Sequence, residues 1–255
     1  MSRIKHKILV LSNKGGVGKS SIAVNLACSL SEKGYKVGIL DADLHGPSVA
    51  TMLGFEGKKL QGSPEGILPM SVSTNLVAVS MASLIESSDA PLIWRGPLKA
   101  MALKQFLGEV QWGVLDYLVI DSPPGTGDEP LSICQLIPEL DGGVIVTTPQ
   151  GVALLDSRKC VNFLKNLKIP ILGIIENMSG LKCPHCGKNI DLFKSGGGEK
   201  AAQEFNLPFL GKVPIDLNIV NSADEGKPYI CQYKDTETSK IFNQIVESII
   251  SQIIQ

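Results

Sequence analysis

Short runs of mostly apolar residues recur along the chain, separated by stretches in which apolar residues follow helical spacing. The runs lie at 8–11, 36–41, 75–81, 117–121, 143–148, 171–176 and 209–213. Runs of this length are typical of strands that are buried on both faces of a parallel sheet. Their alternation with helices predicts an α/β fold, in which helices flank a doubly wound, mostly parallel sheet and crossovers are right-handed.

The helical stretches differ in what their apolar positions imply. They are expected at 19–30, 97–110, 129–137, 152–167 and 236–255. The last one has two adjacent rows of apolar residues but no basic residue after Lys240, whereas helices that lie on membranes are typically rich in lysine and arginine. We therefore expect it to pack on the sheet. Residues 54–72 are rich in glycine and proline, which predicts a surface excursion without regular structure.

Composition and charge narrow the function classes. Hydrophobic residues make up 44% of the 255 residues and charged residues 19%, which suits one well-buried domain over 1–255. The formal net charge of −1 gives no electrostatic footprint for nucleic acid. No run reaches the roughly 18 apolar residues of a membrane span, and the basic N-terminus lacks the apolar stretch of a signal peptide. We expect a cytoplasmic protein that binds neither nucleic acid nor membrane.

The first strand leads into a glycine-rich turn and then a helix, which is the context of a phosphate-binding loop. Glycines let backbone N–H groups crowd round an anion, and the helix N-terminus adds partial positive charge. Lys19 would neutralise the β- and γ-phosphates of ATP, and the Ser20 hydroxyl would coordinate magnesium. A glycine loop that only makes a tight turn is the alternative. The residues expected to bind the nucleotide here are Gly15, Gly16, Val17, Gly18, Lys19, Ser20 and Ser21.

Carboxylates follow two of the predicted strands, at the edge where open parallel sheets bind ligands. Asp121 ends the 117–121 run and fits a Walker B element, which places it near the magnesium. Asp41 ends the second run and Asp43 lies two residues beyond it, and one of them could orient the attacking water. We choose Asp43, which would also lie beside the magnesium. A helix N-cap is the alternative for a lone aspartate.

Residues 122–128 begin with prolines and end with glycines. A loop that senses a γ-phosphate and then moves needs this combination of a stiff start and a flexible end. Pro124, Gly125 and Gly127 form the predicted switch loop, and Asp128 is expected to cap the helix that follows it.

Two residues after later strands are candidates for contacts with the base. Asn177 follows the 171–176 run, and its amide could donate to one atom of the adenine edge and accept from the exocyclic amine. A turn-forming asparagine is the alternative. Pro214 belongs to the loop after the last strand, which we expect to lie against the base.

Cys183 and Cys186 form a Cys-x-x-Cys pair between the Asn177 strand and the next helix, and we interpret residues 180–190 as an inserted metal loop. A zinc or cluster site needs about four ligands, so two thiolates alone would leave it incomplete. A two-fold dimer would supply two such pairs. Structural zinc and a redox dithiol are the alternatives. The other cysteines are interpreted as buried small hydrophobes; they are Cys28, Cys134, Cys160 and Cys231.

The phosphate loop departs from the usual Gly-x4-Gly-Lys-Ser/Thr pattern, because Asn13 replaces the first glycine and Lys14 adds a lysine. The stretch Lys-Gly-Gly-Val-Gly-Lys-Ser at 14–20 resembles the deviant loop of the SIMIBI ATPases, which include MinD, ParA and the nitrogenase iron protein. In that class the early lysine reaches the phosphates of the partner in a nucleotide-sandwiched homodimer. The resemblance implies that Lys14 acts in trans beside catalytic Lys19 and Asp43. A solvated lysine is the alternative for Lys14.

Six motifs in order narrow the resemblance: Lys-Gly-Gly-Val-Gly-Lys-Ser, Asp-Ala-Asp-Leu-His-Gly-Pro-Ser, Asp-Ser-Pro-Pro-Gly-Thr-Gly-Asp, Val-Thr-Thr-Pro-Gln, Glu-Asn-Met-Ser-Gly and Cys-Pro-His-Cys-Gly. Together they resemble the Mrp/ApbC family of iron–sulfur cluster carrier ATPases over essentially the whole chain. The resemblance implies a homodimer that holds a labile 4Fe–4S cluster between its two cysteine pairs. ATP and magnesium would govern cluster loading or transfer to apo iron–sulfur proteins, with a scaffold protein as a possible donor.

Two other functions share parts of this pattern. One is a ParA/MinD-type positioning ATPase that binds DNA or membrane, which the cysteine pair and the neutral charge disfavour. The other is an ATP-dependent chaperone that inserts zinc or nickel through the same cysteines. The identity of the bound metal separates this second function from cluster transfer.

Overall fold

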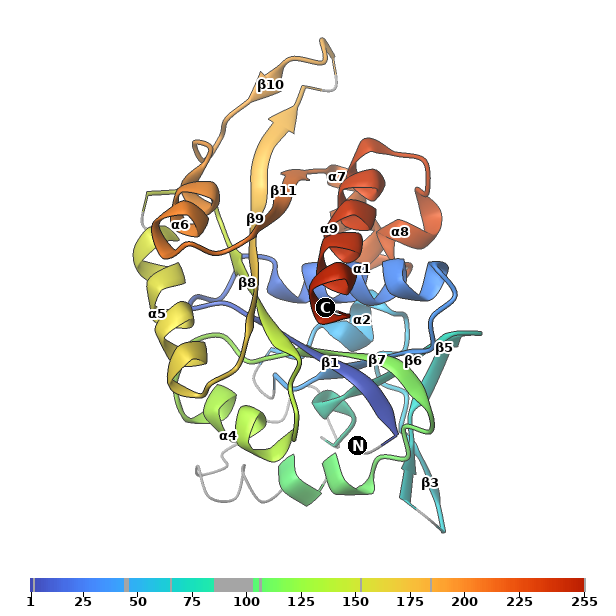
Figure 1. Cartoon of the computed structure of the whole chain (residues 1–255). Helices are drawn as coiled ribbons and strands as arrows, with labels where there is room; N and C mark the ends of the chain where they lie inside the picture. The colour runs from blue at the N-terminus through green and yellow to red at the C-terminus, as the bar shows by residue number, and fades with distance from the viewer. Residues whose placement is uncertain are drawn as a thin grey trace.

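A twisted, mostly parallel sheet forms the centre of the computed structural model, with helices on both of its faces (Figure 1). The structure describes residues 1, 3–43, 46–64, 66–84, 103–105, 107–151, 153–183 and 185–254. The sheet order is β10-β9-β8-β1-β7-β2-β6-β5, and β11 also pairs with β9. The parallel strands are β1 (Ile4–Leu11), β2 (Val37–Asp41), β6 (Leu76–Ser80), β7 (Leu115–Asp121), β8 (Gly142–Thr147), β9 (Ile171–Lys182) and β11 (Phe209–Ile215).

The central strands are buried on both faces, which is why their sequences are apolar throughout. Ile8 and Val10 of β1 belong to one buried cluster, while Leu9 and Leu11 belong to the cluster on the other face. Helices α1 (Lys19–Glu32), α2 (Val49–Met52), α7 (Leu217–Asp224), α8 (Tyr229–Gln232) and α9 (Glu237–Ile253) lie on the first face. Helices α4 (Asp128–Leu136), α5 (Ala153–Asn166) and α6 (Gly197–Phe205) cover the other. The doubly wound fold is confirmed.

The expectation of an irregular excursion over 54–72 holds for residues 54–60 but is wrong from Gln61 onward. Strands β3 (Gln61–Ser63) and β4 (Gly66–Leu68) form an antiparallel hairpin, and β5 (Met70–Ser73) pairs antiparallel with β6. Gly66 reflects close packing rather than an irregular chain, since a Cβ there would lie 2.2 Å from the Glu109 carbonyl oxygen.

The chain between β6 and β7 is described in part. A 3-10 helix η1 (Met81–Leu84) follows β6, and residues 103–105 and 107–109 are helical, as expected for the end of the 97–110 helix. The beginning of that expected helix lies outside the described residues.

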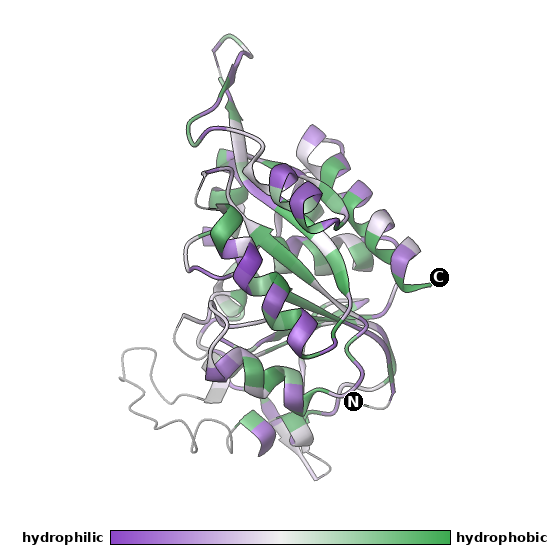
Figure 2. Cartoon of the chain, turned by 60° about the vertical axis from the view of Figure 1, so that its left-hand side comes forward, coloured by the Kyte–Doolittle hydropathy of each residue, from purple (hydrophilic) through white to green (hydrophobic). Residues whose placement is uncertain are grey.

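The cysteine pair lies at the end of a β-ribbon, not in a simple loop. Strand β9 continues six residues past Glu176, where the sequence predicted its end, and pairs with β10 (Asn189–Ile190) beyond the body of the sheet (Figure 2). Met178 and Gly180 have positive φ angles, but β9 continues past both as a strand of the sheet. Residues 180–190 are therefore a projecting hairpin of the sheet.

The C-terminal helix packs as the sequence predicted. The apolar side of α9 lies on β11 and α1, and Phe242, Ile245, Val246 and Ile249 are buried there. Among the described residues, no helix is both long and apolar enough to cross a membrane.

Candidate nucleotide and metal site

The loop between β1 and α1 lines a cavity of about 570 Å³. Gly16 and Gly18 both have φ near +78°, a conformation that favours glycine. A Cβ on Gly18 would lie 2.2 Å from the Asn177 amide nitrogen, so this position also has no room for a side chain. The sequence-predicted residues that line the cavity are Lys14, Gly15, Gly16, Gly18, Lys19, Ser20, Ser21, Asp43 and Pro124.

Asn177 fastens this loop to β9. Its side-chain amide donates a hydrogen bond to the Val17 carbonyl oxygen at 2.8 Å, and the side chain is buried. One amide N–H therefore holds the phosphate loop, which leaves the second N–H and the amide oxygen for a base. Pro214 lies within β11, so its expected place in a loop after the last strand is wrong. It lines a different groove of about 890 Å³, beside Lys182 and Gly187 of the ribbon. The roles of Asn177 and Pro214 toward adenine remain predictions.

Lys19, which lines the cavity, forms a buried ion pair with Asp121, which does not line it. The second Asp121 oxygen, Oδ2, has no hydrogen-bond partner among the described residues. Burial raises the pKa of Asp121, and the charge of Asp43 raises it further, while Lys19 opposes both. A buried carboxylate oxygen without a partner, near a second carboxylate and the Ser20 hydroxyl, fits the hard oxygen ligands that magnesium prefers.

Asp41 is a buried carboxylate that the sequence argument passed over in favour of Asp43. It accepts hydrogen bonds from the backbone N–H groups of Asp43 and Val49, each at 3.2 Å, and from the Ser80 hydroxyl at 3.1 Å. Burial, followed by the charge of Asp121, raises the pKa of Asp41 to about 7. Asp41 thus holds the segment that carries Asp43, whose own carboxylate accepts from the Gly46 N–H at 3.1 Å.

The predicted switch loop contacts the phosphate loop directly. Gly125, with φ +97°, donates its backbone N–H to the Ser12 carbonyl at 2.8 Å. Gly127 is the N-cap residue of α4, so the expectation that Asp128 caps this helix is wrong by one residue. Glu129 in the first turn of α4 also lines the cavity. Only its position just after the switch loop could have indicated it from sequence.

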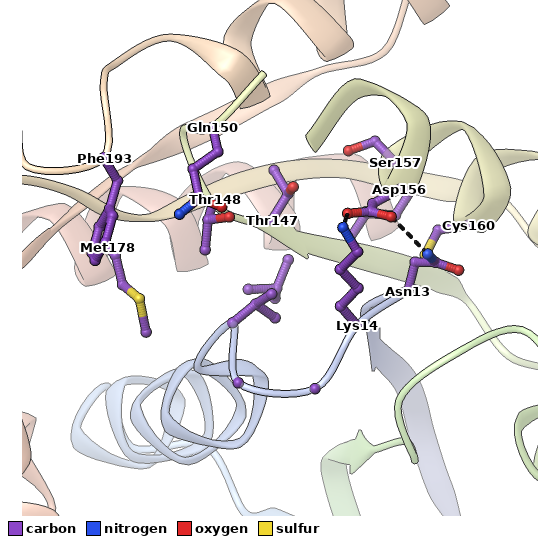
Figure 3. Close-up of a pocket in the computed structure, with 15 residues that line it drawn as sticks. Asn13, Lys14, Thr147, Thr148, Gln150, Asp156, Ser157, Cys160, Met178 and Phe193 are labelled. Atoms are coloured by element: carbon purple, nitrogen blue, oxygen red, sulfur yellow. Dashed lines mark hydrogen bonds and ion pairs between the residues drawn. The ribbon is translucent and has the colours of Figure 1, made fainter. Parts of the chain in front are cut away.

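The two unusual residues of the loop share one partner. Lys14 Nζ lies 2.7 Å from Asp156 Oδ2, and Asn13 Nδ2 donates to Asp156 Oδ1 at 2.8 Å (Figure 3). Asp156 lies in the first turn of α5, across a cavity of about 220 Å³ from Phe193, which follows β10. In this single chain, Lys14 is therefore paired within its own subunit.

The cysteine pair has the geometry of a metal knuckle. The Cys183 N–H donates to the Lys188 carbonyl and the Gly187 N–H to the Cys183 carbonyl, each at 2.9 Å, and Gly187 has φ +70°. Backbone N–H groups of Cys186 and His185 hydrogen-bond to the Cys183 sulfur and lower its pKa. In the described part of the chain, no group of three or more His, Cys, Asp or Glu residues could hold a metal, so the pair lacks further ligands within one subunit.

The base of the ribbon is anchored by Glu176, which the sequence argument missed. This buried carboxylate accepts from the Gly198 N–H at 2.6 Å, the Gly196 N–H at 3.1 Å and the Ser179 hydroxyl. Its position within an apolar run was the available signal, since a buried charge in a strand needs dedicated partners.

The remaining cysteines follow the expectation only in part. Cys28 and Cys160 are buried and Cys134 is partly buried. Cys231 is exposed, so its interpretation as a buried small hydrophobe is wrong. It lies on α8, a short helix at the surface, where an apolar sequence context does not ensure burial.

Comparisons with known proteins identify the family of this chain. A family model described as ParA: NUBPL iron-transfer P-loop NTPase matches residues 3–250. This chain belongs to that family. Among curated members, an iron-sulfur cluster carrier protein of Methanocaldococcus jannaschii is 49% identical over 99% of this chain and 87% of its own length. The cytosolic Fe-S cluster assembly factor CFD1 of Saccharomyces cerevisiae is 45% identical over 99% and 89%. The family resemblance noted from the motifs is confirmed.

Solved structures agree with this membership of the NUBPL iron-transfer family. A nucleotide-binding protein of Archaeoglobus fulgidus in complex with ADP is 37% identical, with a TM-score of 0.79 over 91% of this chain and 90% of that one. The cell division ATPase MinD of Pyrococcus furiosus, 23% identical with a TM-score of 0.71 over 96% and 98% of the two chains, shares the fold.

Proposed function

We propose that this protein is an iron–sulfur cluster carrier, in which a homodimer holds a 4Fe–4S cluster on two Cys183/Cys186 pairs and delivers it to apo-proteins. The observation that carries the proposal is the preformed knuckle on a projecting ribbon, which offers two thiolates without further protein ligands among the described residues. Two-fold pairing would complete four ligands. Relatives named as cluster carriers and as a cytosolic assembly factor support this function and a cytoplasmic location.

Nucleotide binding would use the loop and its neighbours. Lys19 would move from Asp121 to the β- and γ-phosphates, and Ser20 and Asp121 would hold magnesium, which supplies charge neutralisation of the phosphates. Asp43 would accept a hydrogen bond from the attacking water. Lys14 would exchange Asp156 for the phosphates bound by the partner subunit. The ADP found with the Archaeoglobus protein supports a nucleotide in this cavity.

Anaerobic reconstitution with iron and sulfide tests the cluster. The wild type should take up about two irons and two labile sulfides per subunit and elute as a dimer, because one cluster would be shared by two subunits. The Cys183→Ser and Cys186→Ser variants should bind neither iron nor labile sulfide, whereas the matched control Cys134→Ser should bind both as the wild type does. Tight zinc without labile sulfide would contradict the proposal and favour a structural site, and selective nickel uptake would favour metal insertion.

Hydrolysis is tested separately on the same preparations. Magnesium-dependent release of phosphate from ATP should fall strongly in Lys14→Ala, Lys19→Ala and Asp43→Asn. An unchanged rate in Lys14→Ala would contradict a role for this lysine in the partner subunit's site.

A further inference from the structure

A second pair of thiols lies between α1 and α8. Cys28 is buried on α1, Cys231 is exposed on α8, and the two thiols lie close enough to influence each other's pKa. These residues are far apart in the chain and belong to neither the nucleotide cavity nor the ribbon.

The two helices are held in register next to these thiols. One helical turn before Cys28, Asn25 Oδ1 accepts a hydrogen bond from the backbone N–H of Ile230, the residue that precedes Cys231. On the other side, Lys234 forms an ion pair with Glu32 at the end of α1. Contacts on both sides therefore bring α1 and the segment around α8 together next to the two thiols, without involving either thiol.

The surroundings give the two thiols different reactivity. The neighbouring Cys28 thiol lowers the pKa of Cys231, and the charge of Lys234 also lowers it, while burial and Glu32 oppose. The Cys231 thiol, together with burial, raises the pKa of Cys28. An exposed thiol with a lowered pKa is the attacking group, and a buried neutral thiol beside it is the resolving group.

We propose that Cys28 and Cys231 form a redox-active dithiol, which hydrogen peroxide oxidises to a disulfide that ties α8 to α1. The Cys231 thiolate attacks one peroxide oxygen, the O–O bond breaks and hydroxide leaves, so that this sulfur becomes a sulfenic acid. The Cys28 sulfur then displaces hydroxide from the Cys231 sulfur. Its proton combines with that hydroxide as water, and an S–S bond forms.

The disulfide would act on the nucleotide-binding half of the protein. Tyr229, two residues before Cys231, donates its hydroxyl to Asp216 at 2.7 Å, and Asp216 follows the β11 strand that carries Pro214. Helix α1 begins at the phosphate loop. A bond between α1 and α8 would restrict motion of these two segments relative to each other.

The test uses the full chain carrying Cys183→Ser and Cys186→Ser, so that the ribbon cysteines cannot exchange with the second pair. After peroxide treatment, alkylation and proteolysis, mass spectrometry should find Cys28 linked to Cys231, with loss of two hydrogens that dithiothreitol reverses. Adding Cys231→Ser, an exposed substitution that leaves the fold intact, should abolish the link. Adding Cys28→Ala should leave a sulfenic acid on Cys231 that dimedone captures. Recovery of Cys28 as a free thiol after oxidation would overturn the proposal.

Alkylation rates provide a second readout that needs no oxidant. Burial raises the pKa of Cys134 to about 11, whereas that of Cys231 is lowered. Cys231 therefore has the larger thiolate fraction near neutral pH, and the weaker nucleophilicity of a more acidic thiol offsets only part of this advantage. Iodoacetamide should modify Cys231 faster than Cys134, and equal rates would contradict the assignment.

Discussion

Replacing Asp41 with asparagine should change how the stability of the protein depends on pH. Asp41 is fully buried, and its pKa is raised from an ordinary value of 3.8 to about 7. Because the folded protein binds this proton more tightly than the unfolded chain does, the stabilisation is fully present below the ordinary pKa. It is lost as pH rises through about 7. The amide of the Asp41→Asn variant would carry no such proton in either state.

The magnitude follows from the shift of the pKa. A rise from 3.8 to about 7 corresponds to about 4 kcal/mol of unfolding free energy that the wild type loses between acid and mildly alkaline pH. An amide can replace only part of the three hydrogen bonds that the carboxylate accepts, which costs about 1 kcal/mol at every pH. By pH 4.5 the wild type has already lost about 1 kcal/mol of this stabilisation, so Asp41→Asn should be about as stable as the wild type there and about 3 kcal/mol more stable at pH 8.

Urea unfolding of the nucleotide-free and magnesium-free protein, followed by far-ultraviolet circular dichroism from pH 4.5 to pH 8, measures this difference. Asp116→Asn is the matched control, because a hydrogen bond from Lys5 lowers the pKa of Asp116. The stabilisation from Asp116 is present above its unfolded pKa and is lost only as pH falls, so this variant should keep the wild-type slope over the measured range. Parallel curves for Asp41→Asn and the wild type would refute the reasoning.

Three further changes test the loop and the ribbon. Gly18→Ala should lower the unfolding free energy of the nucleotide-free protein by about 1–2 kcal/mol, because residue 18 has a left-handed conformation, and further because the new Cβ would clash with Asn177. Gly15→Ala is the control, since its Cβ would meet nothing within 4 Å and its melting temperature should stay near that of the wild type. Equal melting temperatures would contradict this. Asp156→Asn removes a half-exposed ion pair worth less than about 1 kcal/mol, so dimerisation with a non-hydrolysable ATP analogue, measured by sedimentation, should strengthen a few-fold as Lys14 is released. Weaker dimerisation would argue that the pair assists assembly. Glu176→Gln should destabilise the ribbon base by about 1–3 kcal/mol and speed amide hydrogen exchange over 179–190, and unchanged exchange would exclude the anchoring role.

Local features of the sequence determined the sheet and the phosphate loop, for a physical reason. A strand buried on both faces must be apolar throughout, and a loop that wraps an anion must contain glycine at positions of positive φ, such as Gly16 and Gly18. These constraints act within a few residues, so the sequence carries them directly. The same holds for the cysteine spacing of the knuckle and for the apolar rows of α9.

Contacts between distant segments were decided only by the tertiary structure. Asp156 pairs with Lys14 and Asn13 from more than 140 residues away, and Cys28 meets Cys231 through the packing of α8 on α1. The continuation of β9 past Asn177 depended on hydrogen bonds from β10 and β11, because residues with positive φ have no local preference for a strand. The raised pKa of Asp41 has the same origin, since burial and the nearby Asp121 exist only once separate strands lie side by side in the sheet.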